Sequence, residues 1–531
     1  MDIKHMSLEQ KIGQILMVGF PSDKYDDHIK ELVEEYKIGN FILFSRNIKD
    51  KFQLADLNYE IQRNVIKHVG IPAFIGIDQE GGMVTRIHES TTFLPGNMAI
   101  AATGDPNNAC RIGEISGKEL RALGININFA PVLDVNSNPE NPVIGVRSYS
   151  DNPEMVADFG IKYIEGLQKE NVIATAKHFP GHGDTSVDSH LDLPVITHEK
   201  ERLETTELKP FKKAIENGVD AIMSAHILFT AYENEKLPAT LSYKILTELL
   251  RERMGFKGII LTDCMEMNAI SKYFGTAKAA VMAIKAGADI VLISHTKELQ
   301  IEAFNKIKAA VISGEISELR IDESVRRIID IKKKYNILDD PYPNYKLVNE
   351  IVGCAYHRKV AEEISRNSLT LVKDEMNLIP IRTKNILAIS PESTIFSKIA
   401  DKLTSNLSFA EAVVNKFGGD SMKIPVNPDE SIINSILEKI EKYDLIIVGT
   451  YNANLNGGQV KLVNNILNKT KNVIVVALMN PYDILKFKDV STYLCAYEYT
   501  QLSVNNIIEC LNGKFNSSGD TSSVIVKRGF K

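Results

Sequence analysis

The chain has 531 residues, of which 44% are hydrophobic and 24% charged. This is ordinary globular composition and excludes a collagen-like or wholly disordered chain. The 68 acidic and 62 basic residues give a net charge of −6, which provides no electrostatic footprint for nucleic acid or an anionic membrane. The five cysteines are scattered and form no CxxC pair, which argues against a disulfide scaffold and fits a reducing compartment.

The sequence also gives an expectation for membrane association and location. No apolar run reaches the roughly 18 residues of a membrane span. The segment Met1–Gln10 lacks the apolar stretch of a secretory signal. We therefore expect a cytoplasmic protein without a membrane span.

The first 295 residues alternate between short apolar runs and stretches with helical periodicity. Helical patterns include Asp26–Tyr36, Asn107–Leu123, Glu154–Glu170, Leu203–Asn217, Tyr243–Met254 and Thr276–Ala286. An open doubly wound sheet gives the same alternation, but eight evenly spaced units favour a (β/α)8 TIM-type barrel. The eight apolar runs are Leu16–Phe20, Phe41–Ser45, Ala73–Asp78, Asn126–Val135, Ile173–Phe179, Ala221–His226, Gly258–Asp263 and Asp289–Ile293.

A second α/β block follows a proline-containing linker. The helical pattern continues to about Tyr335, and two prolines, Pro341 and Pro343, then break it. We predict a barrel domain at 1–338, a linker and connecting helix at 339–365, and a smaller α/β/α sandwich domain at 366–531. The apolar runs of this sandwich are Leu369–Val372, Ile386–Ile389, Leu445–Gly449, Val473–Leu478 and Tyr493–Ala496.

Several predicted barrel strands end in ionisable residues. Asp78, His226 and Asp263 are the last residues of the third, sixth and seventh runs, and Lys177-His178 and Asp134 lie at the ends of the fifth and fourth. Active sites of such barrels lie at the carboxyl ends of the strands, so the pattern indicates a polar site on that face. Loops are polar in any case, which explains part of the pattern.

The loop after the fifth run holds three histidines and two aspartates within Lys177–His190. His178 and His182 have the spacing of a helical zinc pair, but Pro180-Gly181 between them prevents a helix, so we expect no metal site. His182 is also compatible with a structural role in the loop. The pair Asp188 and His190 has the composition of a general acid/base, because an aspartate can orient an imidazole and support its charged form.

Asp263 has two interpretations. It follows the apolar run Ile259-Ile260-Leu261-Thr262, so it is either the N-cap of the next helix or a nucleophile at the barrel mouth.

These segments together resemble glycoside hydrolase family 3, and specifically its bacterial β-N-acetylglucosaminidase branch. Lys177–His190 is similar to that branch's K-H-F-P-G-H-G-x-T-x-x-D-S-H signature. Ile77–Gly82 with Arg86 resembles its I-D-Q-E-G-G segment, and Asn141–Ser148 resembles its N-P-x-I-G-x-R-S segment. Ser368–Asp374 looks like the start of the family's second domain, so the similarity covers nearly the whole chain. Met83 is a departure, because many relatives carry a basic residue there.

The resemblance implies roles for individual residues. Asp263 would be the nucleophile, and His190 the acid/base with Asp188 as its partner. The residues that would hold the non-reducing terminal sugar are Asp78, Arg86, Arg147, Lys177 and His178. Family-3 β-glucosidases usually take a carboxylate acid/base from the second domain, whereas the loop here supplies a histidine inside the first. We therefore expect the second domain to contribute no catalytic residue.

The implied function is a retaining exo-β-N-acetylglucosaminidase that acts on murein fragments or chitin oligomers through a covalent glycosyl-enzyme. No metal or organic cofactor is expected, and the partners are small amino-sugar glycosides or muropeptides. One alternative is an N-acetyl-β-glucosaminide phosphorylase, because an imidazole repels phosphate less than a carboxylate does. Another is a non-catalytic muropeptide-binding protein on the same fold. The oligomeric state is left open.

Overall fold

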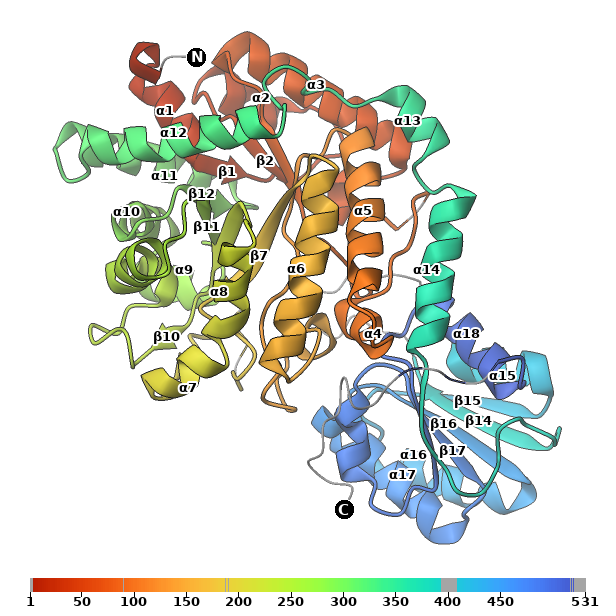
Figure 1. The fold of residues 1–531 in the computed structure, drawn as a ribbon. Helices are drawn as coiled ribbons and strands as arrows, with labels where there is room; N and C mark the ends of the chain where they lie inside the picture. Colours follow the sequence, from red (N-terminus) through yellow and green to blue (C-terminus); the bar gives the residue numbers. More distant parts are fainter. Residues whose placement is uncertain are drawn as a thin grey trace.

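The computed structural model describes residues 3–88, 90–186, 188–189, 191–392, 408–515, 517 and 519. Within these residues, eight parallel strands close into a barrel (Figure 1). The predicted closed barrel, rather than an open sheet, is therefore confirmed. Its strand order is β1 (Leu16–Val18), β12 (Ile290–Ile293), β11 (Ile259–Cys264), β9 (Ala221–Ser224), β7 (Ile173–Phe179), β6 (Ile127–Asn128), β3 (Phe74–Ile77) and β2 (Asn40–Leu43).

Helices surround these strands (Figure 1). The predicted helix Leu203–Asn217 is two helices in the structure, and an ion pair between Arg202 and the buried carboxylate of Glu207 lies where they meet. The stretch Lys244–Arg253 is a helix with π-type hydrogen bonding. The α-helices are α1 (Leu8–Ile15), α2 (Asp27–Glu34), α3 (Lys51–Val69), α4 (Asn97–Ala102), α5 (Asn107–Ala122), α6 (Pro153–Lys169), α7 (Lys200–Thr205), α8 (Leu208–Glu216), α9 (Asn268–Phe274), α10 (Thr276–Ala286), α11 (Lys297–Ile312) and α12 (Glu318–Lys334).

The barrel strands are buried on both faces, which is why they read as continuous apolar runs rather than as alternating ones. Loops at their carboxyl ends carry short two-stranded ribbons. One joins β4 (Gln79–Gly81) and β5 (Val84–Thr85) directly after β3, and another joins β8 (Val195–Ile196) and β10 (Leu228–Phe229). The first ribbon carries residues of the site described below.

The described part of the second domain has a six-stranded mixed sheet in the order β13-β18-β17-β16-β14-β15. Among these six strands, only the pairing of β13 with β18 is antiparallel. Helix α15 packs with α18, and α16 packs with α17. The bounds are β13 (Thr370–Asp374), β14 (Ile386–Pro391), α15 (Phe409–Phe417), β15 (Asp420–Ile424), α16 (Glu430–Leu437), β16 (Leu445–Thr450), α17 (Gly457–Lys469), β17 (Val473–Ala477), β18 (Thr492–Cys495) and α18 (Gln501–Leu511).

The sequence did not indicate β15, the edge strand with the composition Asp-Ser-Met-Lys-Ile. Its residues are mostly exposed, so it lacks the apolar run by which a buried strand is recognised.

The connecting segment forms two helices, α13 (Tyr345–Glu350) and α14 (Ala355–Ser368). Residues Val360, Ala361 and Ile364 of α14 belong to the core of the barrel, and its other end lies against α18 of the second domain. In Figure 1, α14 runs from the barrel down to the smaller domain.

The two domains share a packed boundary. Met98 and Ala99 of α4, and Val146 of a barrel loop, lie in the core of the second domain. Met83 packs against the same core, so the departure from a basic residue at this position is an apolar interdomain contact. The second domain therefore contacts loops at the carboxyl ends of the barrel strands. Within the described residues, no helix is both long enough and apolar enough to cross a membrane.

Candidate active site

A cavity of about 510 Å³ opens at the carboxyl ends of the barrel strands. Its lining residues come from strands β2, β7, β9, β11 and β12 and from the segments that follow β2, β3, β6, β7, β11 and β12. Most of the predicted site residues meet here although they are far apart in the sequence: Asp78, Arg86, Arg147, Lys177, His178 and Asp263 all line the cavity.

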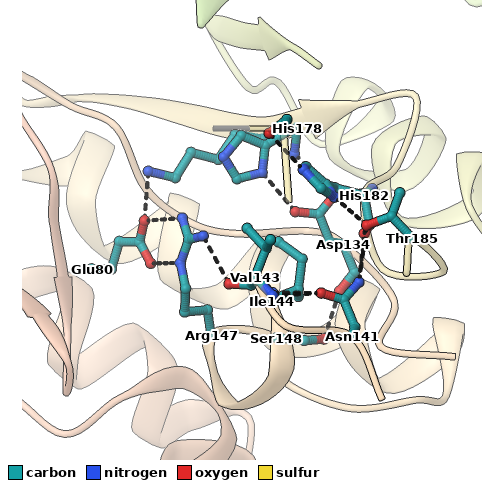
Figure 2. Close-up of polar contacts among 12 residues, drawn as sticks. Glu80, Asp134, Asn141, Val143, Ile144, Arg147, Ser148, His178, His182 and Thr185 are labelled. Atoms are coloured by element: carbon teal, nitrogen blue, oxygen red, sulfur yellow. Dashed lines mark hydrogen bonds and ion pairs between the residues drawn. The ribbon is translucent and has the colours of Figure 1, made fainter. Parts of the chain in front are cut away.

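An ion-pair network joins five polar residues on one side of this cavity, and all of them except Glu80 line it. Lys177 Nζ donates to Asp78 Oδ1 at 2.7 Å and lies 2.6 Å from Glu80 Oε1. Arg147 binds the same Glu80 with two bonds, Nε to Oε2 at 2.9 Å and Nη2 to Oε1 at 2.7 Å (Figure 2). Arg86 Nη2 lies 3.8 Å from Asp78 Oδ2. Three cationic groups and the carboxylate of Asp78 thus line one wall of the cavity, and Glu80 holds two of the cations from behind it.

Glu80 is the anionic centre of this network, and the sequence did not single it out. It is 3% exposed, while Arg147 and Lys177 are 5% and 2% exposed. Burial opposes ionisation of Glu80, but the charges of Arg147 and Lys177 outweigh it and hold the pKa of Glu80 well below its ordinary value. Burial likewise disfavours the charged guanidinium of Arg147, yet Glu80 outweighs it and raises the pKa of Arg147. Both groups therefore stay charged at neutral pH.

A second buried carboxylate, Asp134, organises the histidine loop. Its Oδ1 accepts the backbone N–H groups of His178 at 3.1 Å and His182 at 2.7 Å, and its Oδ2 lies 2.7 Å from His178 Nδ1. Asp134 is fully buried, which opposes ionisation, but the His178 imidazole outweighs this and lowers the pKa of Asp134. Figure 2 shows the Asp134 carboxylate beside both histidines. The contact fixes the His178 ring with Nδ1 directed away from the cavity and toward Asp134.

His182 has the structural role that we considered from the sequence. Its Nδ1 lies 2.8 Å from Thr185 Oγ1 and its Nε2 lies 3.1 Å from Ser189 Oγ. Burial, followed by repulsion from His178, lowers the pKa of His182 to about 4, so the ring is neutral at physiological pH. Asn141 Nδ2 donates to His182 O at 2.8 Å, which ties this loop to the Asn141–Ser148 segment. Within the described residues, no group of three or more metal-ligating side chains occurs.

Asp263 lies near the end of β11, and its side chain lines the cavity. Its Oδ1 accepts the backbone N–H of Cys264 at 2.6 Å. The next helix, α9, has Met267 at its N-cap position, so the alternative in which Asp263 caps that helix is wrong. Burial and then Glu266 raise the pKa of the neighbouring Cys264 thiol to about 12, which leaves it a neutral neighbour.

The predicted acid/base pair is described in part. Asp188 does not line the cavity, whereas Ser189 does, and Ser189 also accepts the N–H of Ala269 through its backbone carbonyl. His190 lies outside the described residues, so its role stays a prediction. Asp184 bonds His198, so the start of the connection between β7 and α7 is tied to its end.

Sequence reasoning also missed four further residues that line the cavity, Phe44, Arg46, Glu266 and His295. The Arg46 guanidinium carbon lies 4.3 Å from the centroid of the Phe44 ring, and the His295 ring lies 5.1 Å from the same centroid. Glu266 accepts the N–H of His295 at 2.7 Å. The signal in the sequence was their position at or just after the ends of predicted strands.

Comparisons with known proteins agree with this architecture. The model of the glycosyl hydrolase family 3 N-terminal domain matches residues 7–331. A curated relative, beta-hexosaminidase A of Pseudoalteromonas piscicida, is 36% identical over 376 residues, which is 67% of this chain and 62% of that protein. The chain thus spans less than two thirds of the length of this relative.

Two solved structures cover nearly the whole chain. A family 3 beta-N-acetylglucosaminidase from Paenibacillus sp. is 40% identical, with a TM-score of 0.90 over 97% of this chain and 98% of the other. A beta-glucoside phosphorylase is 25% identical, with a TM-score of 0.82 over 98% of this chain and 94% of the other. The second domain is therefore part of the shared architecture.

Proposed function

The chain belongs to glycoside hydrolase family 3, and from this premise we propose that it is a retaining exo-β-N-acetylglucosaminidase. The observation that carries the proposal is the cavity at the barrel mouth, in which the carboxylate of Asp263 faces the same space as Asp78, Arg147 and Lys177. A nucleophile beside a wall of fixed hydroxyl-binding groups suits the hydrolysis of a terminal sugar. The names of the relatives supply the N-acetyl-β-hexosaminide specificity.

In the proposed reaction, Asp263 Oδ2 attacks the anomeric carbon while the glycosidic oxygen accepts a proton and leaves. The Cys264 N–H on Oδ1 stabilises the negative charge of the carboxylate before attack and orients its other oxygen. Water then releases the sugar from the glycosyl-enzyme, and the β configuration is retained.

We assign the proton transfers to His190, with Asp188 as its partner. The support is the family motif and the position of Ser189, which brings this loop to the cavity. An imidazole acid/base delivers its proton in the first step and removes one from water in the second. After the first step the His190 imidazole is neutral, so it does not repel an anionic acceptor of the sugar such as phosphate.

Asp78, Arg86, Arg147, Lys177 and His178 are the proposed sugar-binding residues. Their carboxylate and cationic groups match vicinal hydroxyls, which accept and donate hydrogen bonds at the same time. Because Glu80 and Asp134 fix Arg147, Lys177 and His178 before substrate arrives, little ordering is required on binding.

The direct test compares wild type with Asp263→Ala on an aryl N-acetyl-β-glucosaminide. We expect turnover to fall by several orders of magnitude, about 10⁴-fold or more, with binding of N-acetylglucosamine retained. Asp158→Ala is the control, because Asp158 is an exposed carboxylate of α6 that pairs with Lys213 and does not line the cavity. A wild type that binds the sugar but never turns over would favour the muropeptide-binding alternative instead.

Phosphorolysis is a second candidate, because a solved relative with the same two-domain coverage is named a beta-glucoside phosphorylase. Here phosphate rather than water would accept the sugar from Asp263. Product analysis with and without phosphate separates the two reactions, since only phosphorolysis yields the sugar 1-phosphate.

For the natural substrate we propose murein fragments or chitin oligomers with a terminal β-linked N-acetylglucosamine. Product analysis on murein fragments against chitobiose distinguishes them. We further propose a cytoplasmic location, supported by the free thiols Cys110, Cys264, Cys354, Cys495 and Cys510.

A further inference from the structure

We propose that Glu498, a residue of the second domain, is a positioning residue for the sugar-binding wall. This wall is the side of the barrel cavity formed by Asp78, Arg86, Arg147 and Lys177. Glu498 joins the segment that follows Glu80 to the start of α4, the helix whose first residue bonds the backbone of Arg147. The proposal rests on the proposed function, because it assumes that Arg147 and its neighbours bind the sugar.

Glu498 lies between β18 and α18 and is directed out of its own domain toward the barrel. Its Oε2 accepts the backbone N–H of Gly96 at 2.9 Å, although the two residues are 402 positions apart in the sequence. Its Oε1 lies 3.4 Å from the hydroxyl of Thr500. With 2% of its surface exposed, the carboxyl group belongs to the buried domain boundary.

The second contact of Glu498 is a close approach at Gly82. This glycine directly follows β4, which contains Glu80, and it has a φ of +55°. A Cβ at Gly82 would lie 2.9 Å from Gly96 Cα and 3.3 Å from Glu498 Oε2. Three segments from two domains therefore meet without room for a side chain, so displacement of any one of them is transmitted to the others.

Both barrel segments lead directly to the sugar-binding wall. Gly96 is the N-cap residue of α4, and the next residue, Asn97, donates from Nδ2 to Arg147 O at 2.7 Å. The Arg147 guanidinium in turn binds Glu80, which lies two residues before Gly82. A cavity of about 10 Å³ directly behind this pair is lined by Glu80, Arg147 and Glu498. Glu498 thus contacts the segment that carries Glu80, at Gly82, and the segment that holds Arg147, at Gly96.

The charged groups that line the small cavity with Glu498 are Glu80 and Arg147. Burial raises the pKa of Glu498 to about 7, so its carboxyl group titrates near neutral pH. In both protonation states an oxygen remains to accept the Gly96 N–H. The bracing requires this acceptor rather than a charge, so glutamine is expected to replace glutamate.

The alternative is that Glu498 only holds the domains together, with no specific effect on the sugar site. A matched control separates the two roles. Asp374 is a carboxylate of the second domain whose bonds to Leu378, Ile379 and Thr492 all stay within that domain. Asp374→Ala disturbs the second domain without touching the Gly96 contact.

The experiment measures steady-state kinetics of the full-length protein on an aryl N-acetyl-β-glucosaminide. We expect Glu498→Ala to raise KM about tenfold with a much smaller change in kcat, because a misplaced wall weakens sugar binding. Glu498→Gln should keep KM near wild type, and Asp374→Ala should leave KM unchanged even if it lowers the melting temperature. An equal KM in Glu498→Ala and Asp374→Ala, or no rescue by glutamine, would overturn the proposal.

Two further measurements keep the test decisive. Asn97→Ala breaks the same path inside the barrel, so its effect on KM should not add to that of the Glu498 variants. If Glu498→Ala does not fold, Glu498→Leu is combined with Asn97→Ala instead. Additive effects of the two substitutions on KM refute the proposed connection from Glu498 through Asn97 to Arg147. Hydrogen exchange needs no turnover, and we expect faster exchange at 96–100 and 145–148 in the Glu498 variant. Unchanged exchange there refutes the positioning role, whereas a wild type without turnover refutes only the proposed function.

Discussion

Replacement of Glu80 by glutamine is the most informative perturbation of the sugar-binding wall. The substitution keeps the shape of the side chain but removes the negative charge between Arg147 and Lys177. In the wild type the Glu80 carboxylate accepts two hydrogen bonds from Arg147 and forms an ion pair with Lys177 at 2.6 Å. After the change, two cations less than 6% exposed face each other with Asp78 as the nearest carboxylate of the network.

The expected cost follows from this burial. Removal of one partner from a buried, hydrogen-bonded ion pair typically costs about 3–5 kcal/mol, because the remaining charge stays desolvated. The Lys177 contact with Asp78 compensates in part, so we expect about 3 kcal/mol. Repulsion between Arg147 and Lys177 should also displace both groups and raise KM by at least about tenfold.

The assay combines chemical denaturation with steady-state kinetics. The matched control is Glu114→Gln, because Glu114 pairs with Lys169 at 2.8 Å on the surface, where the lysine is 65% exposed. An exposed pair of this kind contributes about 0–1 kcal/mol. If both variants lose the same small stability, or if Glu80→Gln keeps the wild-type KM, the reasoning about the buried network is refuted.

The pH dependence gives an independent check on Glu80. Its folded-state pKa lies well below the ordinary value of 4.5, so its contribution to stability is fully present above about 4.5 and is lost as the pH falls through the lower folded-state value. The stability difference between wild type and Glu80→Gln should therefore be constant at neutral pH and shrink in acid. A difference that grows below pH 4.5 would contradict this assignment.

Three further predictions concern titratable groups. Burial raises the pKa of Glu498 from 4.5 to about 7, so its contribution to stability is lost as the pH rises through this window. In thermal melting we therefore expect Glu498→Gln to be more stable than wild type at pH 8 and similar to it at pH 4. The buried ring of His182, with a pKa of about 4, should show no titration above pH 5 in its ¹⁵N NMR signals. His190→Ala should impair substrates with sugar leaving groups far more than aryl substrates with acidic leaving groups, because only the former need full protonation.

The barrel could be predicted because its parallel strands are covered on both faces. Runs such as Ile259–Leu261 are therefore apolar throughout and stop at a polar residue where the strand reaches the site. That single regularity is enough to place Asp78, Lys177-His178 and Asp263 on one face of the barrel. The roles of individual residues came instead from the family motifs.

The remaining features depend on contacts between distant parts of the chain. Glu80 was visible in the sequence, but nothing local shows that Arg147, 67 positions away, folds back onto it. The contact between Glu498 and Gly96 spans 402 positions and two domains. Strand β15 is polar and pairs only at the edge of its sheet, so its position is determined by the neighbouring β14 rather than by its own pattern.

Trapping of the glycosyl-enzyme tests the central claim most directly. A 5-fluoro-N-acetylglucosaminyl fluoride slows both steps but carries a leaving group that needs little protonation, so the intermediate should accumulate. Peptide mapping by mass spectrometry is then expected to find one fluorosugar on the peptide that contains Asp263, and none in Asp263→Ala. An adduct on a different carboxylate, or turnover of natural substrate with inversion and no adduct, would contradict the account.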